Sequence, residues 1–167
     1  MSKTSDNLQA AFAGESQASR KYLYFAEKAD EEGHRQIARL FRAASEAETV
    51  HARNHLKVMQ GIKSTKDNLL AAIGGENYEF TKMYPDFMKQ ADAEGNKKAK
   101  DSFELANKVE QIHHRLYQEA LSMLERSQTI AEKPIYVCQV CGNTVGDEAP
   151  EKCPICGAPK KMFKRID

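Results

Sequence analysis

Two short motifs in this 167-residue chain have residue types and spacing that suit metal binding. Glu48 and His51 stand three positions apart, and the pair recurs as Glu110 and His113 in the second half of the chain. Side chains with this separation lie on the same side of a helix, so each pair can offer a carboxylate and an imidazole to one ion. A single pair would indicate little, because 29% of the residues are charged and such pairs are common on surfaces.

The place of each pair on its helix is more informative. The first pair continues an apolar stripe that contains Phe41, and the second continues one that contains Phe103, at the three-and-four spacing of a buried face. A buried carboxylate is too costly to keep unless a cation neutralises it. A buried ion-pair network is the alternative, but Arg20, Lys21 and Arg53 lie off the stripes. The pattern therefore favours a metal.

Three more carboxylates stand inside apolar stripes, so that each of four predicted helices contributes a ligand. One Glu from each of two helices, with Glu-x-x-His from each of the other two, is typical of carboxylate-bridged two-metal sites. Five carboxylates carry a charge of −5, which two ions with a summed charge of roughly +4 to +6 would balance, and the mixed oxygen and nitrogen ligands suit iron or manganese, with zinc also able to bind. The candidate ligands are Glu15, Glu48, His51, Glu76, Glu79, Glu110 and His113.

An internal repeat predicts two helical hairpins in tandem. Apolar periodicity predicts helices from a Ser5 or Asp6 cap to about residue 33, from about 35 to 60, from about 68 to 95 and from about 96 to 127. The halves match at an offset of 62 in the numbering, as Tyr22 does with Tyr84. Four such helices indicate a bundle.

The first helices of the two hairpins match at a different offset. Glu15 corresponds to Glu76, an offset of 61, so one extra residue must lie between Glu76 and Tyr84. A single extra residue in a helix predicts a π-bulge, a feature common at functional sites, and Glu79 stands there. Pro85 should add a local kink or a lost hydrogen bond.

The chain ends with a second metal-binding pattern. Residues 142–152 separate two Cys-x-x-Cys pairs, and this spacing is typical of a tetrahedral four-thiolate site. Zinc and iron both accept four cysteinates. A segment of about 35 residues supports little core, so the metal should organise it. The ligands are Cys138, Cys141, Cys153 and Cys156.

Composition excludes several classes of partner. The 25 basic and 24 acidic residues leave a net charge of +1, so nothing indicates nucleic acid or an anionic membrane. Mean hydropathy is −0.67, and no apolar run approaches the roughly 20 residues that span a bilayer. The first residues lack the apolar core of a signal peptide. We expect a cytoplasmic protein with a helical domain at 1–130 and a small metal-binding domain at 134–167.

Taken together, these motifs resemble the rubrerythrin family over essentially the whole chain. The resemblance implies a mainly α protein, a ferritin-like four-helix bundle with a non-haem di-iron site, joined to a small β-rich rubredoxin-like domain with one iron on four cysteinates. It also implies reduction of hydrogen peroxide to water in oxidative stress defence. The resemblance is carried by residues 13–18, Glu48 with His51, Gly75-Glu76 with Glu79, residues 83–85, Glu110 with His113, and the four cysteines.

The resemblance also implies roles for individual residues. The carboxylates and His113 would hold the oxidised di-iron pair, and on reduction one iron would exchange Glu79 for His51. Tyr22 and Tyr84 match family tyrosines beside the site, which makes them candidate catalytic residues, although spacing alone fits core aromatics equally well.

The route of electrons predicts an assembly. A helix rise of 1.5 Å per residue puts Ser127 roughly 20 to 25 Å beyond the turns that carry Glu110 and His113. Unless the linker folds back, that is far for electron transfer within one chain, so we expect a head-to-tail homodimer in which each tail serves its partner. An NAD(P)H-dependent reductase or a rubredoxin is the electron donor that the resemblance implies. The alternatives are a ferroxidase or iron-storage protein and a zinc-stabilised module without turnover.

Overall fold

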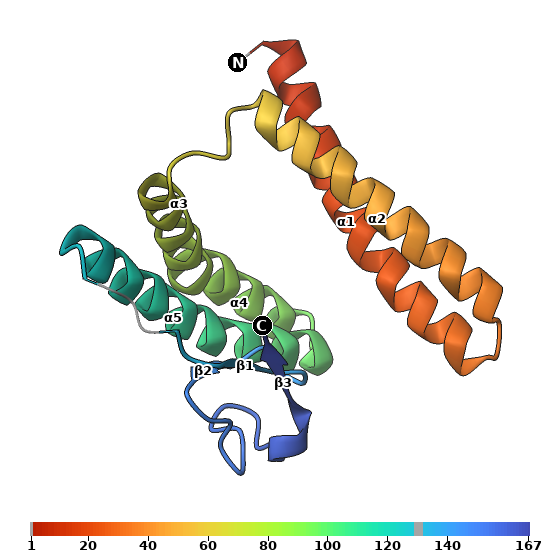
Figure 1. Ribbon diagram of the computed structural model, residues 1–167. Helices are drawn as coiled ribbons and strands as arrows, with labels where there is room; N and C mark the ends of the chain where they lie inside the picture. The colour runs from red at the N-terminus through yellow and green to blue at the C-terminus, as the bar shows by residue number, and fades with distance from the viewer. Residues whose placement is uncertain (1, 129–131) are drawn as a thin grey trace. The chain divides into compact units, whose positions relative to one another are not determined.

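The computed structural model describes residues 2–128 and 132–167, and the chain divides into two compact units, Met1–Lys63 and Ser64–Asp167. The first unit is a hairpin of α1 (Lys3–Glu31) and α2 (Arg35–Val58) (Figure 1). Ala26, Ala29 and Ala38 form its buried core, with Phe41 packed against them. Such small side chains let the two helix backbones approach closely. The hydroxyl of Ser2 accepts the amide of Ser5 at 3.2 Å and caps α1, so the predicted cap at Ser5 or Asp6 is wrong by one turn.

The second unit begins with a helix that the structure divides in three. α3 (Thr65–Tyr78) continues into the π-helix η1 (Glu79–Met83) and then into α4 (Tyr84–Ala93). The amide of Tyr84 donates to the carbonyl of Glu79, five positions earlier, which is the π pairing. The predicted π-bulge between Glu76 and Tyr84 is therefore confirmed. α5 (Lys97–Glu125) completes the second hairpin.

The two hairpins repeat each other in their aromatic packing. In the first hairpin the rings of Phe25 and Phe41 lie 5.6 Å apart and both contact Tyr22. In the second hairpin the rings at the corresponding positions of the repeat, Phe87 and Phe103, lie 5.5 Å apart and both contact Tyr84. This correspondence confirms the tandem repeat.

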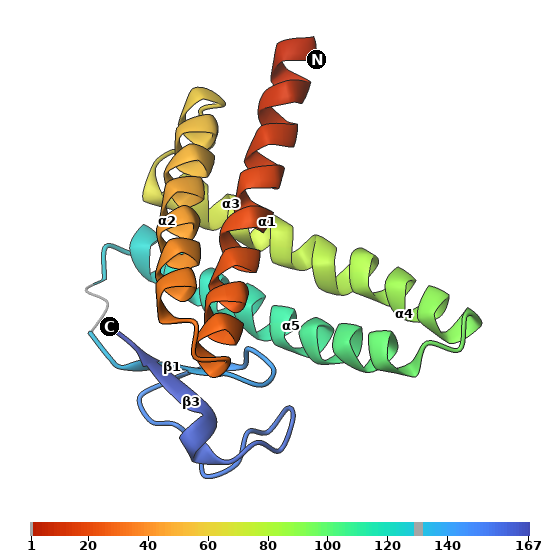
Figure 2. The same cartoon turned by 90° about the vertical axis from the view of Figure 1, so that its right-hand side faces the viewer.

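The second unit ends in a small sheet domain that lies beside α5 (Figures 1 and 2). Its antiparallel strands run in the order β2-β1-β3, from β1 (Ile135–Cys138), β2 (Thr144–Gly146) and β3 (Phe163–Ile166), and the 3-10 helix η2 (Lys160–Met162) precedes β3. In register, Tyr136 of β1 pairs with Val145 on one side and Arg165 on the other. The predicted class, four long helices plus a small β-rich domain, is confirmed, whereas the boundaries at 1–130 and 134–167 stay predictions.

Among the described residues, no helix is both long and apolar enough to cross a membrane. The cytoplasmic location stays a prediction.

Candidate metal centre

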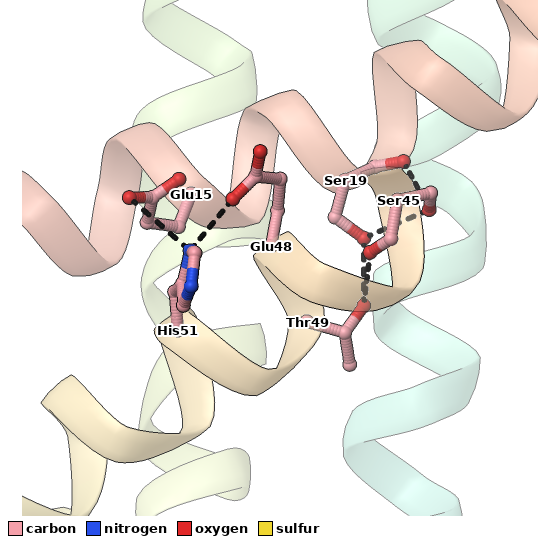
Figure 3. Close-up of polar contacts among 6 residues, drawn as sticks. All are labelled: Glu15, Ser19, Ser45, Glu48, Thr49 and His51. Carbon is pink, nitrogen blue, oxygen red and sulfur yellow. Dashed lines mark hydrogen bonds and ion pairs between the residues drawn. The ribbon is translucent and has the colours of Figure 1, made fainter. Parts of the chain in front are cut away.

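The first hairpin brings three predicted ligands together. Glu15 on α1 faces Glu48 and His51 on α2, and the ligand atoms of this first trio lie within 4.8 Å of one another (Figure 3). The Nδ1 atom of His51 is 2.8 Å from Glu48 Oε2 and 4.0 Å from Glu15 Oε1. The His51 side chain is 54% exposed.

A buried hydroxyl cluster fixes α1 against α2 next to the first trio. Ser45 donates its hydroxyl proton to the carbonyl of Ser19 at 2.8 Å, and Thr49 donates to the carbonyl of Ser45 at 2.9 Å (Figure 3). The hydroxyl oxygens of Ser19 and Thr49 are also 2.9 Å apart. These short side chains reach one another only at one axial register of α1 against α2. The cluster therefore fixes the register that places Glu15 opposite Glu48.

The second hairpin builds a trio with the same geometry. Glu76 on α3 faces Glu110 and His113 on α5, again with ligand atoms within 4.8 Å. The Nδ1 atom of His113 is 2.8 Å from Glu110 Oε2 and 4.0 Å from Glu76 Oε1. The second trio is more enclosed than the first, since its side chains are 15–27% exposed.

The two carboxylates of the second trio repel each other. Burial and the neighbouring charge of Glu110 raise the pKa of Glu76 from 4.5 to about 7. Burial followed by the same repulsion raises the pKa of Glu79, whereas the hydrogen bond with Glu110 raises that of His113. Carboxylates with ligand oxygens within 4.8 Å of each other favour a cation between them, as expected of metal ligands.

Glu79 stands beside the second trio. It is the first residue of the π-helix, and Glu110 and His113 are the charges that perturb it, although Glu79 is outside the group of ligand atoms within 4.8 Å. Tyr84, at the other end of the π-helix, has its pKa raised by burial and then by Glu110, Glu79 and Glu76. Its phenol therefore stays protonated at neutral pH.

Tyr22 contacts Phe25 and Phe41 in the first hairpin, as Tyr84 contacts Phe87 and Phe103 in the second, and its catalytic role stays a prediction. His114, the neighbour of His113 in the chain, packs its ring on Phe80 at 5.3 Å and does not belong to the second trio.

The four cysteines converge in the small domain. Their sulfur atoms lie within 4.8 Å of one another, with Cys138 to Cys156 at 3.7 Å and Cys141 to Cys153 at 3.6 Å. These distances are too long for disulfides, and they match the spacing of roughly 3.8 Å between sulfurs that each lie about 2.3 Å from one tetrahedral metal. The donor set therefore fits one zinc or iron.

Main-chain amides favour the thiolate form of Cys153, whereas burial raises the pKa of Cys141 and Cys156. Burial alone would raise the pKa of the Cys153 thiol, but amide hydrogen bonds from Cys156 and Ile155 lower it to about 7. The side chain of Asn143, which is only 1% exposed, also points its amide nitrogen at the Cys153 sulfur, 3.6 Å away. Sequence analysis missed Asn143, because no spacing rule marks a residue that acts through one amide group.

A hydrogen bond connects the second trio with the small domain. The Nε2 atom of His113 lies 3.0 Å from the hydroxyl oxygen of Thr144, which is 3.1 Å from the carbonyl oxygen of Gly142. Gly142 directly follows Cys141 in the chain. The small domain therefore does return to α5, which is the exception that the distance argument allowed, and the homodimer stays a prediction.

The repeated helical hairpins, their Glu, Glu and His trios, and the four-cysteine site define a ferritin-like metalloprotein with a rubredoxin-like domain. Residues 6–121 match the family described as Rubrerythrin, and residues 136–164 match its rubredoxin-like domain. The chain belongs to the rubrerythrin family.

Several known proteins are similar over nearly their whole length. Rubrerythrin-2 of Clostridium acetobutylicum is 36% identical, with 96% of this chain and 95% of that protein covered. The rubrerythrin of Porphyromonas gingivalis is 38% identical, with 98% and 90% covered. Nigerythrin, solved in mixed-valence, partially reduced and fully reduced all-ferrous states, has a TM-score of 0.58 and 35% identity over 99% of this chain and 88% of its own.

Proposed function

We propose that this protein is a non-haem di-iron peroxidase that reduces hydrogen peroxide to water in oxidative stress defence. The observation that carries the proposal is the contact of His113 with Thr144, because it joins a metal-binding trio to a four-cysteinate domain by two hydrogen bonds. A storage or ferroxidase site needs no such connection. Membership in the rubrerythrin family supports the same activity.

The proposal assigns two irons to the bundle ligands and one to the cysteines. The two trios with Glu79 would hold the di-iron pair, and the four thiolates would hold the third iron. When bound, the di-iron pair supplies two electrons to the O–O bond, and the cysteinate iron returns electrons one at a time. With two protons, these two electrons convert one peroxide molecule into two water molecules.

The chain's own residues prepare this chemistry. The protonated phenol of Tyr84 can donate a hydrogen bond toward the carboxylates that raise its pKa. The imidazole of His51, which is 54% exposed, would be available as a ligand in place of Glu79. Thr144 holds the far side of the His113 ring, and a group that orients a ligand in this way commonly tunes its metal.

The proposal extends to partners that supply electrons and complete the assembly. An NAD(P)H-dependent reductase or a rubredoxin would reduce the cysteinate iron. We also propose a homodimer. The homodimer is proposed from membership in the rubrerythrin family. The small domain contacts α5 of its own chain, so distance no longer requires a second chain.

Metal analysis and turnover test the function together. Iron-loaded protein should contain about three irons per chain and consume peroxide with a chemical reductant. The double variant Glu76→Gln with Glu110→Gln should keep the cysteinate iron and lose peroxide consumption. Protein with zinc on the cysteines, or turnover that survives the double variant, would contradict the proposal and favour the zinc-stabilised module or an unrelated site.

A further inference from the structure

The π-helix leaves the main-chain carbonyl of Phe80 without its usual partners. In an α-helix this carbonyl would accept the amide of Tyr84, and in the π pairing it would accept the amide of residue 85. The Tyr84 amide donates to Glu79 instead, and residue 85 is a proline, which has no amide hydrogen. A partly buried carbonyl in this position needs a donor from elsewhere.

Asn107 of α5 supplies that donor. Its Nδ2 atom lies 3.0 Å from the Phe80 carbonyl oxygen. Its Oδ1 atom accepts a hydrogen bond from the side-chain amide of Gln111 at 3.1 Å, and Gln111 also donates to the Asn107 carbonyl at 3.2 Å. Because Oδ1 is occupied as an acceptor, the amide group is oriented with Nδ2 toward Phe80.

The first hairpin shows what the same position does without a π-bulge. Ser45, which corresponds to Asn107 at the offset of 62, donates to the carbonyl of Ser19, which corresponds to Phe80 at the offset of 61. α1 is an uninterrupted α-helix, so the Ser19 carbonyl also has the helical partner that the Phe80 carbonyl lacks. The contact between the paired helices is thus repeated, but only the second hairpin depends on it.

We infer that Asn107 is a positioning residue that holds the π pairing and thereby places Glu79 at the metal centre. The Tyr84 amide has two competing acceptors, the carbonyl of Glu79 in the π pairing and that of Phe80 in the α pairing. When Tyr84 donates to Glu79, the Phe80 carbonyl loses its main-chain donor, and Asn107 supplies a replacement, so the π pairing leaves no partly buried carbonyl unsatisfied. The role of Glu79 as a metal ligand rests on the proposed function, whereas the hydrogen-bond competition does not.

Hydrogen exchange on the metal-free protein tests the competition by itself. In Asn107→Ala the Tyr84 amide should exchange about tenfold faster, because the π pairing loses its support. Pro85→Ala restores an amide at the position that the π pairing uses for Phe80, so it should bring exchange in Asn107→Ala back to within about threefold of the unsubstituted protein. Ser45→Ala is the matched control in the first hairpin, and it should speed Tyr84 exchange no more than its effect on global unfolding, measured alongside, accounts for.

The spectrum of the iron-loaded protein tests the link to Glu79. Asn107→Asp, which keeps the shape of the side chain but cannot donate, should shift the oxidised di-iron absorption toward that of Glu79→Gln while the cysteinate absorption stays constant. The two substitutions combined should match Glu79→Gln alone. Unchanged Tyr84 exchange in Asn107→Ala, no rescue by Pro85→Ala, or additive spectral shifts would overturn the inference. If the hydrogen-exchange results are as expected but the iron-loaded protein does not turn over peroxide, the proposed function is wrong and the inference about Asn107 is not.

Discussion

The Nε2 atom of His113 lies 3.0 Å from the hydroxyl oxygen of Thr144, and this contact assigns the protons of both groups. The Thr144 hydroxyl has one proton, and the Gly142 carbonyl at 3.1 Å can only accept it. When the Thr144 hydroxyl donates to Gly142, its oxygen accepts from the Nε2 hydrogen of His113. In the neutral imidazole, Nδ1 then presents its lone pair on the side of Glu110 and Glu76, where a cation would sit.

Removing this hydroxyl should slow electron transfer between the metal centres. Thr144→Val keeps the shape of the side chain but neither accepts from His113 nor donates to Gly142, and loss of a ligand's outer partner commonly costs about tenfold or more. Stopped-flow oxidation of the reduced cysteinate iron by peroxide measures the rate. Thr144→Ser keeps the hydroxyl and should stay close to the unsubstituted rate, and an equal loss in both variants would contradict the assignment.

Metal-free protein should lose stability as the pH rises from about 5 to 8. The pKa of Glu76 is raised from 4.5 to about 7 in the folded protein, so its carboxyl ionises more readily after unfolding, and stability is lost as the pH passes from the lower to the higher value. His113, whose pKa is raised chiefly by Glu110, contributes in the same direction. Thermal unfolding in a chelator measures the slope. Glu76→Gln should make the dependence of stability on pH less steep. An equally steep dependence in that variant would mean that other groups cause it.

The hydroxyl cluster of the first hairpin should stabilise the protein measurably. Ser45 is 3% exposed, and Ser45→Ala removes its hydrogen bond to the Ser19 carbonyl. We expect the free energy of unfolding to fall by about 1 kcal/mol, as for a typical buried hydrogen bond. Denaturant unfolding gives the value. Ser102→Ala, at an exposed position of α5, is the control and should change stability by less than about 0.5 kcal/mol.

Loss of one cysteine should unfold the small domain and spare the helices. Cys153→Ser removes the thiol whose pKa the surrounding amides lower, and a domain of this size depends on its metal for stability. The visible absorption of the cysteinate iron should disappear and proteolysis should cut the chain after α5. Far-ultraviolet circular dichroism should keep its helical signal, and a large loss of that signal would show that the helices depend on the small domain.

Helical periodicity determines how much of the site could be predicted from the sequence. Glu48 with His51, and Glu110 with His113, are local pairs whose positions on a helix face follow from their spacing alone. The π-bulge was predictable because a continuous helix accommodates one inserted residue most simply by widening a single turn. Both features depend on residues that are near each other in the chain or in a repeated register.

The contacts made by Thr144 and Asn107 could not be predicted in this way. Thr144 is 31 residues from His113, and Asn107 is 27 residues from Phe80, so each contact depends on how separate elements pack. The return of the small domain to α5 could not be predicted for the same reason. The rise along a straight helix says nothing of where a sheet domain packs after the helix ends.

In the proposed function, electrons pass from the four-cysteinate iron to a peroxide-reducing di-iron site, and a single-turnover experiment measures that transfer. Fully reduced, iron-loaded protein is mixed with hydrogen peroxide under anaerobic conditions while the absorption of the oxidised cysteinate iron is recorded. We predict rapid appearance of that absorption in the unsubstituted protein and none on the same time scale in Glu76→Gln with Glu110→Gln. Equal rates in the two proteins would mean that peroxide oxidises the cysteinate iron directly, which would contradict electron transfer to a di-iron site.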